Sequence, residues 1–254
     1  MQNRYTGDVG DFAKYGLLRA LARPGERAAL RLGLVWHLVP DESHNSDGNH
    51  VAYLGPRHGA RFRPCDPPLF DAMAALVAAG RRSVAEVLKS RVLGDELASW
   101  HEPLAWREGS RRREREERRA AWLAGALAAT AGAELVCFDP DNGLEVASHG
   151  RYARLGPKYA FVDELGAYAA RGQSLVVYQH MNRSAPGAEQ CARSLRRLAR
   201  AVPSHAPPFA LRFCAFSARA FLILPARRHE RVLRARARQL LGSPWAAHFA
   251  GVGC

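Results

Sequence analysis

The chain has no apolar run of the roughly 18 residues that a membrane-spanning helix needs, and Met1 to Tyr5 is polar rather than the apolar core of a secretory signal. The sequence therefore predicts a cytoplasmic protein without a membrane partner. Its five cysteines lie far apart and form no Cys-x-x-Cys pair, so neither a disulfide framework nor a structural zinc site is indicated. We expect free thiols, with Cys137 and Cys214 in the core because both lie in apolar runs.

Lysine is scarce: of the 37 basic residues 34 are arginine, and only Lys14, Lys89 and Lys158 are lysine. An ammonium is compact where a guanidinium is a planar fork, so a lysine in so arginine-rich a sequence is a candidate functional residue, with chance as the alternative. Acidic residues are also few, 24 in all, which leaves a net charge of +13 at pH 7. This excess indicates a polyanionic partner, nucleic acid first, unless the arginines only solvate the surface.

Apolar residues make up 48% of the 254 residues, enough to bury the core of one large domain. Dense apolar runs predict strands over residues 30–39, 134–138, 174–178, 209–216 and 219–224. Helical spacing and capping signals predict helices over 11–23, 158–171, 187–201 and 228–241, and others that begin at Asp66 and Ser83. This alternation indicates one α/β domain over residues 1–254 with a mostly parallel, mixed sheet, a C-terminal antiparallel strand pair and a helical insertion at about residues 66–129.

Arginine-rich segments are the candidate nucleic-acid contacts. Residues 111–119 mix arginine and glutamate, which is typical of a solvated helix, with nucleic-acid contact as the alternative. Two other segments repeat arginine at helical spacing and so place four guanidiniums on one helix face, which fits a phosphate backbone or a solvated surface equally well. The first, our candidate nucleic-acid-binding face, comprises Arg193, Arg196, Arg197 and Arg200; the second comprises Arg227, Arg231, Arg234 and Arg238.

Polar clusters follow three of the predicted strands, at residues 40–50, 139–145 and 178–183, and a fourth precedes the first helix at residues 3–15. Each cluster alone is typical of a turn. Ligands of open α/β sheets lie beyond the carboxyl ends of the strands, so several clusters at one edge predict a ligand site there.

The sequence also resembles known families. The segment Gly7-Asp8-x-x-Asp11-x-x-Lys14-Tyr15, the strand that ends in Phe138-Asp139-Pro140 and the later strand 175–178 resemble, in order and spacing, the adenine-N6 methyltransferases of large-subunit ribosomal RNA. Those enzymes begin with Gly-Asn-x-x-Asp-x-x-Lys-His and carry Asp-Pro-Pro-Tyr after a strand. A fainter similarity is to three-Cys-motif partner proteins. The segment 3–19 with Asp-Pro-Asp-Asn-Gly-Leu-Glu at 139–145 is similar, over nearly the whole chain, to an uncharacterised bacterial family.

The methyltransferase resemblance implies a Rossmann-like, methyltransferase-type sheet and a nucleic-acid-directed, S-adenosylmethionine-dependent adenine-N6 methyltransferase. Asp139 then accepts the exocyclic amine of the target base, and Pro140 shapes the same turn. Lys14 and Asp11 border the cofactor and the base. On this basis we assign the following residues: for catalysis Asp139, Lys14, Asp141 and His180, and for the cofactor Asp11, Tyr5, Asp41, Asp47 and Gly48.

Two departures from the family pattern leave other functions open. Residues 39–43 replace the Gly-rich turn of the family, and Asp141-Asn142 stands where Pro-Tyr would stack on the target base. The added carboxylates suit a divalent cation and phosphate chemistry, which makes a metal-dependent nuclease or phosphodiesterase the alternative. A non-catalytic nucleic-acid-binding module is a third. The metal ligands of the alternative are Asp41, Asp47, Asp139 and Asp141, with His44, His50 and His180 as further candidates.

Overall fold

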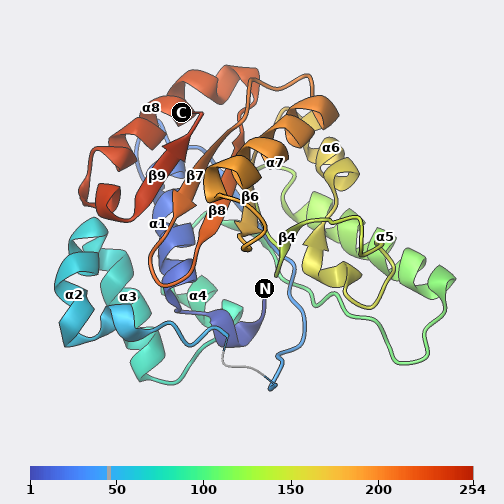
Figure 1. Cartoon of the computed structure of the whole chain (residues 1–254), viewed down its shortest axis with the longest axis horizontal. Coiled ribbons are helices and arrows are strands. Elements are labelled where there is room, and N and C mark those ends of the chain that lie inside the picture. The colour runs from blue at the N-terminus through green and yellow to red at the C-terminus, as the bar shows by residue number, and fades with distance from the viewer. Residues whose placement is uncertain (45–46, 254) are drawn as a thin grey trace.

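A mixed sheet of short, buried strands forms the centre of the fold (Figure 1). The computed structural model describes residues 1–44 and 47–253; positions 45 and 46 of the first polar cluster and the cysteine at position 254 lie outside the described residues. In spatial order the strands are β2 (Ala98–Trp100), β1 (Leu32–Trp36), β3 (Leu135–Asp139), β6 (Ser174–His180), β8 (Arg219–Leu224), β7 (Phe209–Phe213) and β9 (Phe249–Val252). The β2-β1-β3-β6 part is parallel, and β8, β7 and β9 continue it with antiparallel pairs. The predicted α/β class, parallel core and antiparallel C-terminal pair are confirmed.

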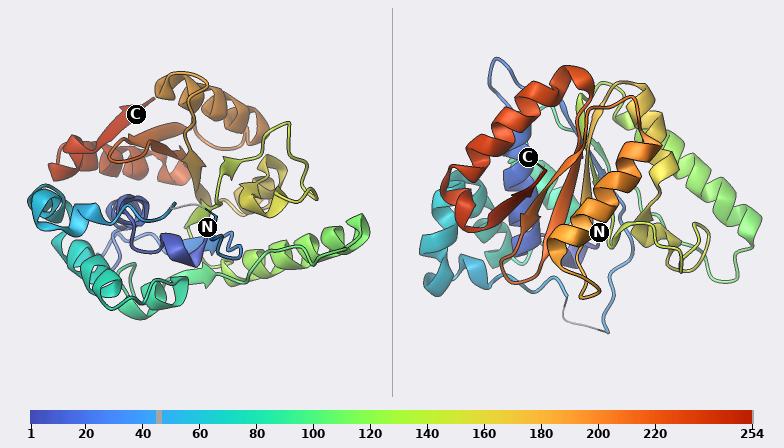
Figure 2. Two further views of the ribbon diagram at one scale, coloured as in Figure 1. Left: turned by 60° about the horizontal axis from the view of Figure 1, so that its bottom comes forward. Right: turned by 45° about the horizontal axis from the view of Figure 1, so that its top comes forward.

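Helices cover both faces of this sheet (Figures 1 and 2). On one face lie α1 (Val9–Ala22) and α8 (Glu230–Leu241), with α2 (Pro56–Phe62), α3 (Pro67–Ala78) and α4 (Val84–Ser90) packed beside α1. On the other lie α5 (Arg112–Ala129), α6 (Val162–Ala170) and α7 (Gly187–Ala201). A separate two-strand pair joins β4 (Gly143–Leu144) to β5 (Tyr159–Ala160). No helix among residues 1–44 and 47–253 is long and apolar enough to cross a membrane.

Alternation along the strands separates two apolar cores. In β1, Leu34 and Trp36 pack with α1, while Val35 between them packs with residues of α5 and α6. Side chains of a strand point alternately to opposite faces, so an apolar residue at every position requires cover on both. The all-buried β1 and β3 therefore lie between two helical layers, and their carboxyl ends, each followed by a polar segment, lie at one edge of the sheet.

Three helices begin directly after a residue whose side chain caps their first turn. The Asp8 carboxylate accepts hydrogen bonds from the backbone N–H groups of Gly10 and Asp11 at the start of α1. Asp66 and Ser83 accept the corresponding bonds at the starts of α3 and α4, as the sequence predicts. The capped end of α1 thereby directs the polar amino-terminal segment to the same edge as the carboxyl ends of β3 and β6.

Several sequence expectations need correction. The helix expected over 158–171 begins only at Val162, because residues 159–160 pair as β5 with β4. Residues 66–129 contain the edge strand β2 besides three helices, so the segment is not purely helical. Cys137 is buried as expected, but Cys214 is exposed because β7 ends at Phe213, one residue before it. Cys65, Cys137, Cys191 and Cys214 are free thiols.

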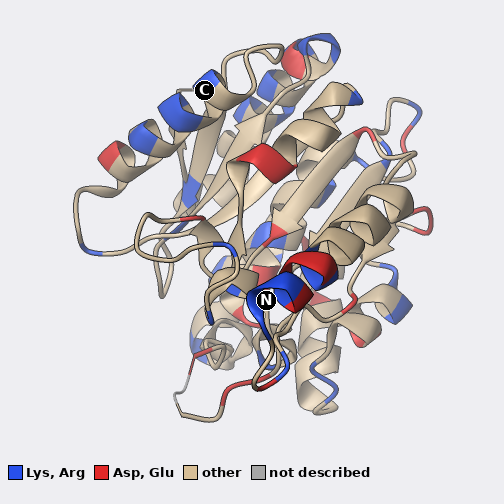
Figure 3. Ribbon diagram, turned by 90° about the vertical axis from the view of Figure 1, so that its right-hand side faces the viewer, with Lys and Arg blue, Asp and Glu red and all other residues tan. Residues whose placement is uncertain are grey.

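The mixed-charge helix α5 is solvated along most of its first turns and projects from the body of the molecule (Figure 2). Arg112 and Arg113 are strongly exposed and pair with Glu116 and Glu117 one turn later, as expected of a solvated face. Arg119 is the exception, because it is buried and binds Glu164 of α6. Across the ribbon, basic and acidic positions are interspersed rather than confined to one region (Figure 3).

Candidate functional site

The three polar clusters and the amino-terminal segment line one cavity of about 510 Å³ at the carboxyl ends of β3 and β6, which we call the site cavity. The polar clusters thus meet at one edge of the sheet, as their positions after the strands predict. Two of the three lysines, Lys14 and Lys158, line it, whereas Lys89 is exposed on α4 and pairs with Glu86. Residues that line the site cavity include Tyr5, Asp8, Gly10, Asp11, Lys14, Glu42, His44, Asp47, Gly48, His50, Asp139, Asp141, Asn142, Arg154, Lys158, Tyr178, His180 and Arg219.

Lys14 joins two carboxylates in a buried cluster at the base of the site cavity. Its Nζ lies 2.7 Å from Asp11 Oδ1, one turn earlier on α1, and 2.6 Å from Asp139 Oδ2 at the end of β3. All three side chains are nearly inaccessible to solvent. Burial alone would lower the pKa of Lys14, but the two carboxylates raise it well above its usual value, so Lys14 is an ammonium.

Asp139 has one oxygen bound and one oxygen left for a ligand. Lys14 donates to Oδ2, and among the described residues no group donates a hydrogen bond to Oδ1. Asp139 lines the site cavity. A rigid strand end, an ammonium that fixes the carboxylate and an unused acceptor together suit a group that must hold a donor in one orientation.

A second lysine cluster closes the opposite wall. Lys158 Nζ lies 2.6 Å from Glu42 Oε1 and 3.0 Å from Asp141 Oδ2, and the Gln2 amide donates to both carboxylates. Burial alone would raise the pKa of Asp141, but the terminal amino group and Lys158 lower it below its usual value. Asp141 is therefore ionised: its Oδ2 is bound by Gln2 and Lys158, while its Oδ1 lies 3.6 Å from the Met1 amino group and accepts no hydrogen bond from the described residues.

Met1 lies against the segment that follows β1. Its amino group donates to the carbonyl of His37 at 2.9 Å, and the backbone N–H of Val39 donates to the Met1 carbonyl at 2.9 Å. Met1 is buried. The space beyond the end of β1 is thus filled by the chain itself, and Met1 lines the site cavity.

Close packing at the start of α1 explains Gly10. A Cβ atom at this position would lie 1.5 Å from Nη1 of Arg219, which opens β8 and donates to the Ser217 hydroxyl. Arg219 is buried, with Nη1 3.9 Å from Asp8 Oδ1. Arg219, Glu42 and Arg154 also line the site cavity, although the sequence did not predict them as site residues. Arg219 begins a strand and the other two lie in loops, and neither position indicates which distant residues lie nearby.

Placement differs among the residues assigned from sequence. Tyr5, Asp11, Lys14, Asp47, Gly48, Asp139, Asp141 and His180 line the site cavity. Asp41 instead lines a neighbouring cavity, and its carboxylate accepts a hydrogen bond from the Arg4 backbone. Burial, followed by the charge of Arg219, lowers the pKa of His180, so its imidazole is neutral at pH 7.

The donor set of the metal-dependent alternative is not assembled in the part of the chain that the structure describes. Within it, no group of three or more His, Cys, Asp or Glu side chains is arranged to hold a metal ion. Asp139 and Asp141 are paired with Lys14 and Lys158, and Asp41 faces away from both. Because an ammonium and a divalent cation compete for the same oxygens, these pairings favour lysine-held carboxylates over a metal centre.

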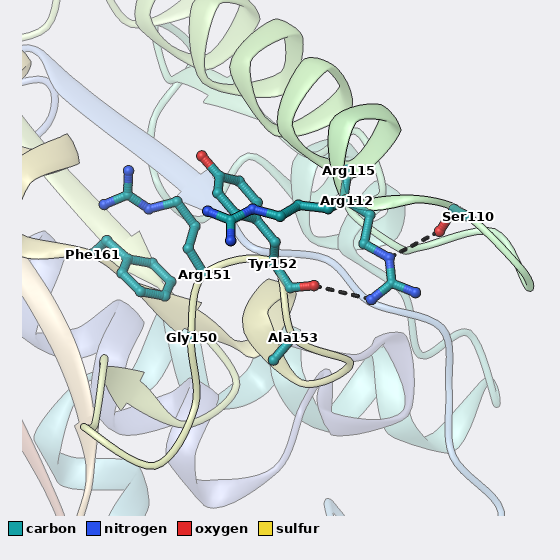
Figure 4. A pocket seen from close by; sticks show the side chains of 8 residues that line it. All are labelled: Ser110, Arg112, Arg115, Gly150, Arg151, Tyr152, Ala153 and Phe161. Atoms are coloured by element: carbon teal, nitrogen blue, oxygen red, sulfur yellow. Dashed lines mark hydrogen bonds between the residues drawn. The ribbon is translucent and has the colours of Figure 1, made fainter.

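A hollow larger than the site cavity, which we call the arginine hollow, has a volume of about 600 Å³ and is lined by Arg112, Arg115 and Arg151 with Tyr152 and Phe161 (Figure 4). It holds no carboxylate or imidazole among its lining residues. We therefore place the candidate chemistry in the smaller site cavity, where buried carboxylates and ammonium groups converge.

The arginine face on α7 is exposed, as its spacing predicts. Its four arginines line a groove of about 420 Å³ with Val162 of α6. Arg193 pairs with Glu189, and Arg197 binds Glu145 in the loop after β4. This leaves Arg196 and Arg200 without a carboxylate partner among residues 1–44 and 47–253.

Asp11 gives the site a measurable pH dependence. Burial raises its pKa to about 6 although Lys14 opposes the shift, so the folded state holds this proton more tightly than the unfolded chain. The resulting stability is complete below the ordinary pKa of 3.8 and is lost as pH rises through about 6. We therefore expect Asp11→Asn to gain stability relative to the parent protein as pH rises from about 5 to about 7. Urea denaturation of both proteins across this range is the measurement, and parallel curves would contradict the assignment.

No protein-family model matches the sequence, and no curated protein matches it. The fold and the site define a class only: an α/β protein with a polar cavity at the carboxyl edge of its sheet, built from two lysine–carboxylate clusters.

Proposed function

We propose that this protein is a nucleic-acid-directed, S-adenosylmethionine-dependent methyltransferase that acts on an exocyclic amine, with adenine N6 as the favoured target. The observation that carries the proposal is the Asp139 carboxylate, fixed by Lys14 on one oxygen and available on the other within a cavity. The sheet supports it, because β8 is inserted antiparallel between β6 and β7 beside a parallel core, which fits the methyltransferase-type sheet of the resemblance.

The residues present fit S-adenosylmethionine by charge and size. The molecule carries a sulfonium and an ammonium, and the site cavity is lined by the Asp47 carboxylate beside Tyr5 and Gly48, with Asp11 at its base bound to Lys14 and to the Gly7 backbone. A cavity of about 510 Å³ is within the usual size of small-molecule sites. Because Met1 fills the space at the end of β1, these residues of the site cavity would hold the cofactor. When bound, it supplies the methyl group.

The protein groups then position the amine and manage its proton. Asp139 Oδ1 accepts one N–H of the amine and so orients the nitrogen lone pair away from the carboxylate. Lys14 is a positioning residue, because its Nζ holds Asp139 Oδ2 and Asp11 Oδ1. Methylation of the nitrogen releases one proton, and the neutral imidazole of His180 at the same cavity can take it.

Calorimetric titration of the purified protein tests the proposal. We expect S-adenosylmethionine to bind the folded protein, and Mg²⁺ or Mn²⁺ added separately to leave that affinity unchanged. A methyl-transfer assay on mixed RNA and DNA then identifies the acceptor. Absence of binding at millimolar cofactor would remove the methyltransferase, and nucleic-acid binding without cofactor would indicate a non-catalytic module.

The arginine face on α7 is the proposed contact for the phosphate backbone. Replacing Arg196 and Arg200 with glutamine should reduce the slope of log affinity against log salt by roughly two on a duplex, at about 0.9 per phosphate contact, and by roughly 1.4 on a single strand, at about 0.7 per contact. The control is the pair Arg231→Gln and Arg238→Gln on α8, which lies on the opposite face of the sheet. An unchanged slope in the α7 variant would assign its arginines to solvation.

A further inference from the structure

A second cavity adjoins the site and shares a wall with it. This Trp106 cavity has a volume of about 430 Å³ and lies between the segment after β1, residues 104–109 and the turn before β5. Its other lining residues include Val39, Leu104, Arg107, Arg115 and Pro157. Four residues line both this cavity and the site cavity: Glu42, Arg154, Leu155 and Lys158.

The Trp106 cavity combines a held aromatic ring with unpaired guanidiniums. Trp106 is half-buried, and its Nε1 donates to the Ala153 carbonyl at 2.7 Å, which fixes the ring against the chain. Arg107 and Arg154 are exposed and have no hydrogen-bonding or ionic side-chain partner among residues 1–44 and 47–253. Arg154 is the more informative of the two, because it lines both cavities.

The acidic groups of this cavity are largely engaged within the protein. Glu42 pairs with Lys158, and Asp41 accepts a hydrogen bond from the Arg4 backbone. Glu108 remains, on the exposed side beside Arg107. The available charges around the aromatic ring are therefore two arginines against one glutamate, a balance that favours an anionic ligand with a flat apolar part.

We propose that the Trp106 cavity binds the nucleotide next to the target in a single-stranded nucleic acid, with its base stacked on Trp106 and the linking phosphate on Arg154. The proposal rests on the proposed function of the site cavity. A strand with one nucleotide at Asp139 and the next in the Trp106 cavity passes the wall that the two cavities share, and Arg154 lies there. Only a base free of its duplex neighbours can stack on a protein ring, so the substrate is a single strand or an unpaired segment.

Beyond the Trp106 cavity the surface again combines arginine and aromatic side chains. Arg115 lines both the Trp106 cavity and the arginine hollow, where the Arg112 guanidinium lies 5.6 Å from the centre of the Tyr152 ring (Figure 4). Arginine and aromatic residues thus follow one another from α5 to the site. Such a series is typical of grooves that track a single strand.

Fluorescence titration with a single-stranded oligonucleotide that carries 2-aminopurine tests the proposal. On the parent protein we expect stacking to quench the 2-aminopurine, and Trp106→Leu to abolish the quench and weaken affinity about tenfold. Arg154→Gln should reduce the salt slope by about 0.7, the value of one single-strand phosphate contact. The matched control is Arg231→Gln, an exposed arginine on α8, which should change neither quantity.

Arg154→Gln decides the outcome if Trp106→Leu fails to fold, because the Arg154 side chain is exposed and supports no core contact. The inference is overturned if both variants keep the salt slope and the 2-aminopurine quench of the parent protein. If they also keep cofactor binding and methyl transfer, the proposed function still stands. Equal binding of the fully paired duplex overturns the single-strand specificity. A parent protein that binds no nucleic acid overturns both proposals, and its cofactor titration then shows separately whether the cofactor assignment holds.

Discussion

Asp139→Asn is expected to lower methyl transfer about 10²- to 10⁴-fold, with little change in cofactor affinity. Asparagine keeps the size of the side chain but removes the charge that binds Lys14 at 2.6 Å, so its amide can turn a donor toward the amine. The ammonium is then left with Asp11 alone. The measurement is the single-turnover rate at saturating cofactor, with calorimetric affinity measured on the same protein.

Asp141→Asn is the matched control for this variant. Asp141 lies two residues further along the same turn and lines the same cavity, but it is engaged by Lys158 and Gln2. We expect its loss to act mainly on KM, as a change in substrate recognition, while kcat stays within a small factor of the parent value. Thermal unfolding of both variants separates loss of fold from loss of chemistry. Full methyl-transfer activity in Asp139→Asn would contradict the assignment of the site cavity as the active site.

Arg119→Met is expected to lower the free energy of unfolding by about 3–5 kcal/mol. Arg119 is buried and binds both oxygens of Glu164, at 2.6 and 2.8 Å, as well as the carbonyls of Gly156 and Tyr159. Methionine fills the space of the stem but removes the two hydrogen bonds that Arg119 donates to Glu164, which leaves this carboxylate only the longer ion pair with Arg151, at 3.7 Å. The two carbonyls flank Lys158, so the same change should also loosen the wall between the site cavity and the Trp106 cavity.

Urea denaturation at fixed pH measures this effect. The matched control is Arg113→Met on the same helix, where an exposed arginine pairs with Glu117 and the expected change is within about 0.5 kcal/mol. The double variant Arg119→Met with Glu164→Leu should recover much of the lost stability, because it removes the buried charge together with its partner. Equal losses in the Arg113 and Arg119 variants would contradict the role of the buried pair.

Local pattern by itself determined the main elements of this fold and one edge of its site. The apolar runs that became β1, β3 and β6 are long and undivided, and α7 occupies residues 187–201 as its spacing predicts. The starts of α3 and α4 could also be predicted, because a capping side chain binds backbone groups only a few residues away. Polar residues after consecutive parallel strands must share an edge, so the meeting of the clusters could also be predicted.

Tertiary structure alone decided which groups meet within that site. Lys14 and Asp139 are 125 residues apart, and Lys158 and Glu42 are 116 apart, so no local signal pairs them. The same is true of Arg119, which has the charge pattern of a solvated helix yet is buried because α6 packs against that turn of α5. Asp41 shares its segment with Glu42, but the direction of the loop after β1 places it in the neighbouring cavity. Periodicity assigns a residue to a helix or strand, whereas the partner of a buried charge depends on how elements distant in sequence pack, and this packing sets the chemistry of the cavity.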